Sequence, residues 1–371
     1  MLRRIYDLNF FDAFIAGATA VAVPLMMLES GIGAAAIGIA FSLAAGARII
    51  FRLFGGAAAD TLGERKMYFA ASLCNLLQTL FYYFTPTAIG FTLGKAMDSA
   101  RDSVMSSLGR VSVLAATPQK EHFGLAGMMS GRFAYNALGS LAVGVLFASG
   151  GFPLVLCALA AIATFMLFLS LGVKNRHPHG NAIRLSDFSF GGRRREFYEA
   201  VGVMLLGAAL YPVMLYFAVP LYFEANGHSA SDIGIYFAAY FLILAATMNA
   251  LSHRGARTGT VAAAGTAIFV LSLSGMVLFP QFMPLLFLIM AFGDGCLGLL
   301  WEEACFVAVK RSRRKAIDLS VALTPASIAI SLSFAVSGFA VEEYGFAPIF
   351  ALAALSLVGF AAWVVRLSKM K

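Results

Sequence analysis

Ala22-Val23-Pro24-Leu25, followed by Gly31 and Ile37-Gly38-Ile39, returns in this chain as Ala218-Val219-Pro220-Leu221, Gly227 and Ile233-Gly234-Ile235. The offset is 196 residues at every one of these positions, with no gap. Each copy lies at the junction of two long apolar segments. A repeat on this scale predicts a chain built of two like halves, and in a membrane protein such halves hold a polar site between them.

The composition indicates a membrane protein. The chain has 371 residues, of which 60% are apolar and 12% are charged, and its mean hydropathy is +0.83. Soluble domains carry about twice that share of charged residues. Because so apolar a surface is stable only in lipid, we expect a polytopic membrane protein. The first apolar segment is long enough to span a bilayer, and we interpret it as a retained helix instead of a signal peptide.

Apolar runs of spanning length predict twelve transmembrane helices. They cover residues 6–29, 34–58, 67–86, 88–114, 122–150, 152–173, 197–225, 230–252, 260–280, 283–309, 319–341 and 346–367. The expected fold is therefore all-α, with two pseudo-symmetric six-helix bundles at residues 1–173 and 197–371. A basic hydrophilic linker at residues 174–196 joins them, and we expect it to be cytoplasmic.

The positive charges fall on one side of the predicted topology. Alternate connectors carry Lys or Arg, at 65–66, 120, 174–195, 254–257 and 310–315, whereas those near 30, 87, 151, 227, 281 and 343 carry none. This asymmetry predicts a cell (inner) membrane protein with both termini in the cytoplasm. The net charge of +8 is explained by these connectors, so we expect the lipid bilayer as a partner and no nucleic acid.

One connector carries a recognisable motif. Between the second and third predicted spans the sequence reads Gly56-Ala-Ala-Ala-Asp60-Thr-Leu-Gly63-Glu-Arg65-Lys66. It resembles the G-x-x-x-D-x-x-G-R-[RK] loop of the major facilitator superfamily, with Glu64 in place of the first basic residue. The resemblance implies the fold of that family and a conformational latch between the halves. The latch residues would be Gly56, Asp60, Gly63, Arg65 and Lys66, with Arg110 near the end of the fourth span as the partner of Asp60.

Ionisable residues at membrane depth are costly, so they usually face a cavity or a partner. The candidates for proton coupling and substrate binding are Asp12, Asp98, Asp294 and Glu302. Further candidates for lining a cavity are Asn9, Arg48, Lys95, Arg101, Arg132, Tyr216 and Trp301.

Two of these acids occupy matching places in the repeat. Asp98 lies one helical turn from both Lys95 and Arg101, with which it can pair. The 196-residue offset places Asp98 on Asp294, which has no basic residue near it in its own span. A desolvated carboxylate without a cation can hold a proton, which is what proton coupling requires.

These observations predict a secondary active transporter that moves a small organic solute by alternating access and is coupled to protons. An alternative is a transition-metal or metal-chelate (siderophore-like) exporter of the same fold, although hard acids without a deep histidine suit soft metals poorly. A receptor or scaffold would need larger connectors. We expect no enzyme, because the sequence has neither a nucleophile–base pattern nor a GxxxxGK[ST] loop.

The remaining expectations concern bound groups and direction. The four cysteines, Cys74, Cys157, Cys296 and Cys305, lie in apolar segments and form no CxxC pair, so we expect no metal site and no cofactor. The partners we expect are a small-molecule substrate and protons, with the chain as a monomer. Gly131, Gly139 and Gly144 lie in the fifth span without the Gly-Pro of the family's antiporter signature, so export cannot be read from it.

Overall fold

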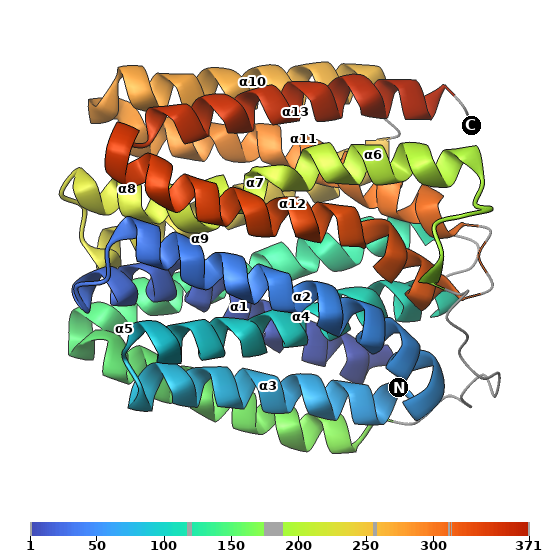
Figure 1. Ribbon diagram of the computed structural model, residues 1–371, viewed down its shortest axis with the longest axis horizontal. Helices are drawn as coiled ribbons and strands as arrows, with labels where there is room; N and C mark the ends of the chain where they lie inside the picture. The colour runs from blue at the N-terminus through green and yellow to red at the C-terminus, as the bar shows by residue number, and fades with distance from the viewer. Residues whose placement is uncertain are drawn as a thin grey trace.

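The computed structural model describes residues 2–116, 121–173, 188–254, 258–310, 312 and 314–369, and within these ranges some side chains, including that of Asp60, are left undescribed. The described chain folds into helices and turns (Figure 1). The helices are α1 (Leu2–Glu29), α2 (Ala34–Leu62), α3 (Glu64–Phe84), α4 (Ala88–Ala116), α5 (Glu121–Leu171), α6 (Arg195–Ala209), α7 (Tyr211–Val213), the π-helical turn η2 (Met214–Ala218), α8 (Val219–Ala225), α9 (Ala230–Arg254), α10 (Thr258–Leu278), the 3-10 turn η3 (Pro280–Phe282), α11 (Met283–Val309), α12 (Lys315–Tyr344) and α13 (Ala347–Ser368).

The predicted all-α polytopic fold is confirmed. Within the described ranges, nine helical stretches are long and apolar enough to cross a membrane. One of them, α5, changes direction at Gly150 and Gly151, where the backbone leaves the helical region, so it supplies two of the predicted spans. Helices α3 and α4 carry more polar residues and complete the set of twelve. The helix bounds differ from the predicted spans by a few residues.

The glycines of the internal repeat mark equivalent turns. Gly31 follows α1 with φ +76°, and Gly227 follows α8 with φ +86°. This left-handed region costs little for glycine because it has no Cβ atom. The two copies of the repeat therefore build the same feature, a helix, a tight turn and a second helix, as the sequence predicted.

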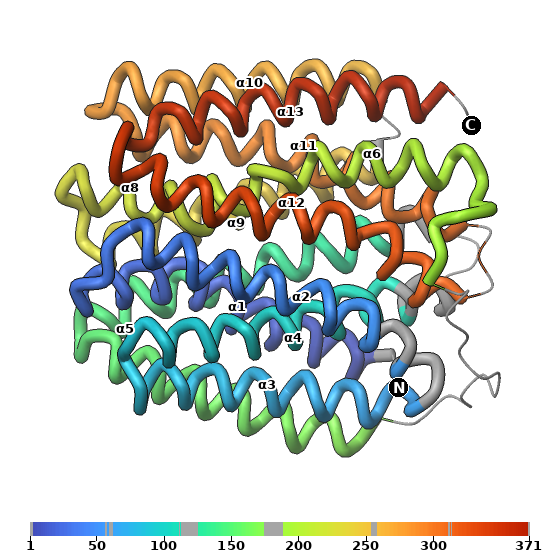
Figure 2. The backbone as a smooth tube through the Cα atoms, viewed as in Figure 1, coloured from blue at the N-terminus to red at the C-terminus, as the bar shows by residue number. Residues whose placement is uncertain are grey.

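The chain forms two groups of helices that pack side by side. Helices α1 to α5 occupy the lower half of the view and α6 to α13 the upper half (Figures 1 and 2). Both termini lie at the same end of the bundle, which we call the terminal end; we call the opposite one the far end. Most of the predicted linker, residues 174–187, lies outside the described ranges, so the domain boundaries at 173 and 197 stay a prediction.

Two seams join the halves, α2 along α12 and α5 along α9. On the first seam, a Cβ atom added to Gly38 would lie 2.6 Å from the carbonyl oxygen of Phe334 and 2.7 Å from Cα of Gly338. On the second, a Cβ added to Gly234 would lie 2.6 Å from the backbone nitrogen of Gly144. Gly38 and Gly234 are 196 residues apart, so the repeat places backbone-to-backbone contact on both seams toward the far end.

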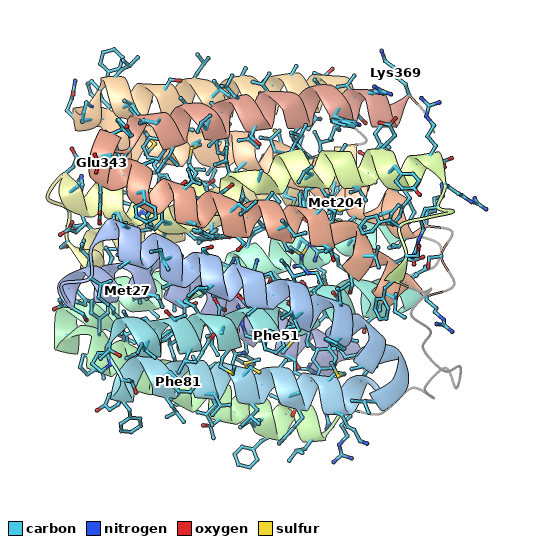
Figure 3. The ribbon with its side chains drawn as sticks, in the orientation of Figure 1. Met27, Phe51, Phe81, Met204, Glu343 and Lys369 are labelled. Atoms are coloured by element: carbon cyan, nitrogen blue, oxygen red, sulfur yellow. The ribbon has the colours of Figure 1, made fainter. Side chains whose placement is uncertain are left out.

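Apolar side chains fill the space between the helices and also cover their outer faces. Met27 and Met204, labelled in Figure 3, are fully buried. Phe54, Leu271 and Leu332 are among the many large apolar side chains that are exposed, each by more than 60%. So extensive an apolar surface is expected of a protein surrounded by lipid and not by water.

Close packing of α1 on α5 gives a first testable prediction. A Cβ added to Gly139 would lie 1.9 Å from the carbonyl oxygen of Phe14, whereas a Cβ added to Gly127 of the same helix has no atom within 4 Å. We expect Gly139→Ala to destabilise the protein by about 1–3 kcal/mol through overpacking. Thermal melting of the detergent-solubilised protein measures this. The matched variant Gly127→Ala should melt at or above the wild-type temperature, and equal melting of the two variants would contradict the prediction.

Candidate functional site

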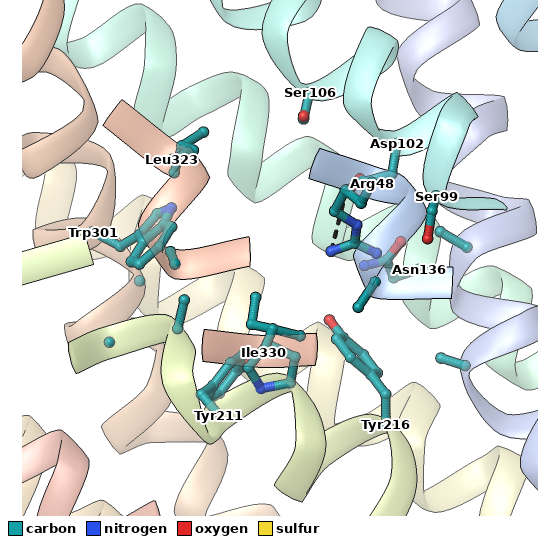
Figure 4. Close-up of a pocket in the computed structure, with 18 of the residues that line it drawn as sticks. Arg48, Ser99, Asp102, Ser106, Asn136, Tyr211, Tyr216, Trp301, Leu323 and Ile330 are labelled. Atoms are coloured by element: carbon teal, nitrogen blue, oxygen red, sulfur yellow. Dashed lines mark ion pairs between the residues drawn. The ribbon is translucent and has the colours of Figure 1, made fainter. Parts of the chain in front are cut away.

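A cavity of about 340 Å³ lies between the two halves (Figure 4). Its volume is in the range of small-molecule sites. Helices α1, α2, α4 and α5 line one side, and α6, α7, η2, α9, α11, α12 and α13 line the other. The lining residues lie around the middle of these helices, as Lys95 and Arg110 of α4 and Asp294 and Glu302 of α11 illustrate.

The far-end side of the cavity is closed by three aromatic rings. Phe41 of α2 contacts Phe217 of η2 and Phe334 of α12 at centroid distances of 6.3 and 5.4 Å, and Phe217 and Phe334 are 6.3 Å apart. Lys95 lies over the Phe41 ring at 5.0 Å. These three rings come from both halves, so they separate if the seams open at the far end.

Two arginines of α2 share one acid of α4. Arg48 and Arg52, one helical turn apart, lie 3.7 and 3.9 Å from Oδ2 of Asp102. Arg52 also donates to the Ser327 hydroxyl of α12 at 2.7 Å, which ties it to the other half. Arg48 and Asp102 line the cavity and are partly exposed to it (Figure 4). Because these ion-pair distances are longer than hydrogen bonds, Arg48 and Asp102 can each exchange this contact for another partner.

Asp98, the acid of the first half, forms the ion pairs that were predicted within its own helix. Asp98 accepts hydrogen bonds from both Lys95 and Arg101 on α4. All three side chains line the cavity. The negative charge of Asp98 is therefore neutralised by two cations.

Asp12 lies behind the lining, in the interior of the first half. Its carboxylate accepts hydrogen bonds from Arg101 at 2.6 Å, from Arg132 at 3.0 Å and from Asn75 at 3.3 Å, and the residue is fully buried. Asn9 is also fully buried, and its side-chain oxygen accepts a hydrogen bond from Arg132 at 3.1 Å. Neither Asp12 nor Asn9 is among the residues that line the cavity, although both were candidates. Both lie on the face of α1 that packs against α3, α4 and α5.

One ion pair crosses between the halves at the terminal-end side of the cavity. Arg110 of α4 donates to both oxygens of Glu302 of α11, at 2.8 and 2.5 Å, and both residues are buried. Such a bidentate pair is both strong and geometrically specific. The sequence pointed to Asp60 as the partner of Arg110. The structure places Glu302 there, and the side chain of Asp60 lies outside the description.

The matching acid of the second half has a different environment. Asp294 lines the cavity, and its Oδ2 accepts hydrogen bonds from the hydroxyls of Tyr211 at 2.6 Å and Tyr240 at 2.7 Å. Within the described part of the chain, no Lys or Arg forms an ion pair with it. Tyr216 and Trp301 line the same side (Figure 4). The second half thus presents one carboxylate held by hydroxyls.

The segment that carries two of these tyrosines is irregular. The helix is interrupted at Leu210, just before Tyr211 and Pro212, and then widens into the π-helical turn η2, which contains Tyr216. Proline removes a backbone donor, and π-helical turns occur often at functional sites. The break turns both phenol rings into the cavity.

The predicted latch loop is only partly described. Gly63, with φ +83°, makes the turn between α2 and α3, in agreement with its predicted role in the turn. Arg65 and Lys66 follow it at the start of α3 and are exposed. The surroundings of Gly56 and Asp60 lie outside the description, so the latch itself stays a prediction.

Several residues of the cavity region were missed from the sequence. Tyr240 lies in an apolar span, where tyrosines usually pack against other helices or lie at the membrane interface. Only its hydroxyl, which needs a hydrogen-bond partner when buried, indicates a further role. Asn75, which bonds Asp12, and Asn136, which lines the cavity, were overlooked for the same reason. Among the described residues, no three His, Cys, Asp or Glu side chains come together as metal ligands would.

The sequence profile described as Major Facilitator Superfamily matches residues 8–302. The chain therefore belongs to this superfamily, and it is a multi-pass membrane protein with the fold of its transporters. Among solved structures it is similar to the crystal structure of the human organic anion transporter MFSD10 (TETRAN). The TM-score is 0.69 at 15% identity, over 98% of this chain and 99% of that one. A search of curated protein sequences finds no match.

Proposed function

We propose that this chain is a proton-coupled secondary transporter that carries a small organic solute through the central cavity by alternating access. It acts as a monomer in the cell (inner) membrane, with the terminal end in the cytoplasm, as the positive connectors indicate. The observation that carries this proposal is Asp294, a cavity carboxylate held by two hydroxyls and by no cation among the described residues.

Asp294 is suited to carry the proton because no described cation pairs with it, so protonation is what neutralises its charge. The other acids around the cavity, Asp98, Asp102 and Glu302, each face at least one arginine or lysine. Asp12, although a sequence candidate, is held by Arg101 and Arg132. We assign Asp12 and Asn9 the task of fixing those two arginines in place, and we assign Asp294 the proton.

The pair formed by Arg110 and Glu302 is the cytoplasmic gate in this proposal. It joins the halves on the terminal-end side of the cavity, where solute must pass to reach the cytoplasm. The aromatic contact of Phe41, Phe217 and Phe334 closes the opposite side. Alternating access then consists of breaking one of these contacts while the other holds.

Breaking the gate gives a second prediction. Glu302→Gln leaves Arg110 buried without its anion, and this destabilises the conformation in which the terminal end is closed. We expect at least about tenfold slower transport and faster thiol labelling of a cysteine placed at cavity residue Ser106. The charge-reversed double variant Arg110→Glu with Glu302→Arg should recover part of both properties. A Glu302→Gln protein with wild-type rates and labelling would contradict the gate.

The proposed function is tested by proton flux, a readout that can be applied to many solutes in turn. Proteoliposomes loaded with a pH-sensitive dye are exposed to a panel of carboxylates, sulfonates, amines, sugars and divalent metal salts. A coupled solute changes the internal pH, and empty liposomes provide the control. Solute movement with no proton movement would contradict the proposal, and a response confined to metal salts would favour the metal exporter instead.

A further inference from the structure

The charges around the cavity do not balance. The first half places five cations in and behind the lining, Arg48, Arg52, Lys95, Arg101 and Arg132, against three acids, Asp12, Asp98 and Asp102. Arg110 and Glu302 neutralise each other across the halves. The described ionisable groups in and behind this side of the lining therefore carry two more positive than negative charges.

Arg48 is the cation with the most unused capacity. Its guanidinium donates no hydrogen bond to any described residue, and its Nε atom is buried without a partner. Its contact with Asp102 is an ion pair at 3.7 Å, longer than a hydrogen bond, and it shares that acid with Arg52. Arg48 is therefore positioned to receive an acceptor that no described residue supplies.

The groups around Arg48 define what could bind there. Asn136 and Ser99 lie near it on the same side of the cavity, and both can donate hydrogen bonds (Figure 4). On the opposite side, Tyr211, Tyr216 and Trp301 present aromatic surface. A planar acidic group matches a guanidinium in geometry, and the apolar remainder of the same molecule matches the aromatic side.

We propose that the transported solute is an organic anion whose acidic group binds Arg48 and Arg52 in competition with Asp102, and whose body packs against Tyr216 and Trp301. This inference rests on the proposed function, because it places the solute in the transport cavity. It names the class of substrate, which the proposed function leaves open.

The same charges set the direction of coupling. Asp294 lies on the side of the cavity opposite Arg48, and no described cation neutralises it. Its protonation therefore increases the net positive charge around a bound anion. The titratable groups that face Asp294 are Tyr211 of α7, Tyr216 of η2, Tyr240 of α9 and Cys296 of α11. Helix α10 contributes an apolar residue, Phe269, which packs against Gly293, the residue next to Asp294. Proton and anion therefore favour each other's binding and move in the same direction.

The experiment compares two probes of similar size that keep their charge from pH 5 to pH 8: benzenesulfonate and phenyltrimethylammonium. Binding to the purified full-length protein is measured by calorimetry and by thermal stabilisation. We expect benzenesulfonate to bind and phenyltrimethylammonium not to bind. Arg48→Gln should weaken the sulfonate by at least about tenfold, and Arg48→Lys should recover part of the loss. The matched control is Arg195→Gln, an exposed arginine outside the cavity, which should bind as the wild type does.

The pH dependence provides the second arm. Wild-type affinity for benzenesulfonate should rise as the pH falls, and Asp294→Asn should bind tightly at every pH, because its side chain is always neutral. Stronger binding of the cation, no binding of the sulfonate, or sulfonate binding that is unchanged in Arg48→Gln would each overturn the substrate class. These binding results need no proton gradient, so a failure of the substrate class is distinguished from a failure of proton coupling, which the transport assays detect.

Discussion

Proteoliposomes that contain Asp294→Asn are expected to exchange solute across the membrane but not to accumulate it when a pH gradient is imposed. The carboxylate lies in the cavity with the hydroxyls of Tyr211 and Tyr240 as its partners, so an amide of the same size keeps the packing while it removes the site that binds the proton. For one proton per solute, each pH unit supports about tenfold accumulation, since 1.36 kcal/mol is a factor of ten.

The measurement is uptake of the solute that the proton-flux panel identifies, with and without the gradient. The control is Tyr240→Phe, which keeps the carboxylate and removes one donor, and which should still accumulate solute. If Asp294→Asn concentrates solute as the wild type does, the proton is carried elsewhere, and Asp12, Asp98 and Glu302 return as candidates.

The second large effect is expected on stability, from Asp12→Asn. This change removes the charge that Arg101 and Arg132 share in the interior of the first half, where no water can replace it. Loss of one partner of a buried ion pair costs about 3–5 kcal/mol. Equilibrium unfolding of the purified protein should show a loss of this size.

Asp102→Asn is the matched control for Asp12→Asn. It makes the same chemical change, but the Asp102 side chain is 27% exposed and its ion pairs measure 3.7 and 3.9 Å. Partly solvated pairs contribute about 1 kcal/mol or less, so the loss should be correspondingly small. Equal losses for the two variants would show that Asp12 does not organise the first half.

The fold could be predicted because its signals are local or periodic. Long apolar runs define the spans, and the recurrence of Gly31 at Gly227 identifies equivalent turns, which the positive φ angles confirm. The break at Gly150 and Gly151 lies at the predicted boundary between the spans 122–150 and 152–173, and adjacent glycines followed by Pro153 explain why the helix is interrupted there.

The site was harder to predict, because a helix that is apolar all round does not reveal which face turns inward. Asp98 could be paired with Lys95 and Arg101, since these contacts lie within one helix. For Arg110 the sequence predicted Asp60 as the partner, which stays a prediction because the side chain of Asp60 lies outside the description, and it did not predict the contact with Glu302 of α11. The orientation of α1 likewise places Asp12 away from the cavity, and the spacing of residues along the chain could not predict this orientation.

The central claim is that the two halves open the cavity to one end at a time. It is tested most directly by spin-label distances in a variant without the four native cysteines. One pair, Thr87 and Asn226, spans the halves at the far end, and the other, Lys66 and Lys310, spans them at the terminal end. We predict that solute and pH shift the two distances in opposite directions. Distances that stay fixed, or that lengthen and shorten together, would contradict alternating access in this protein.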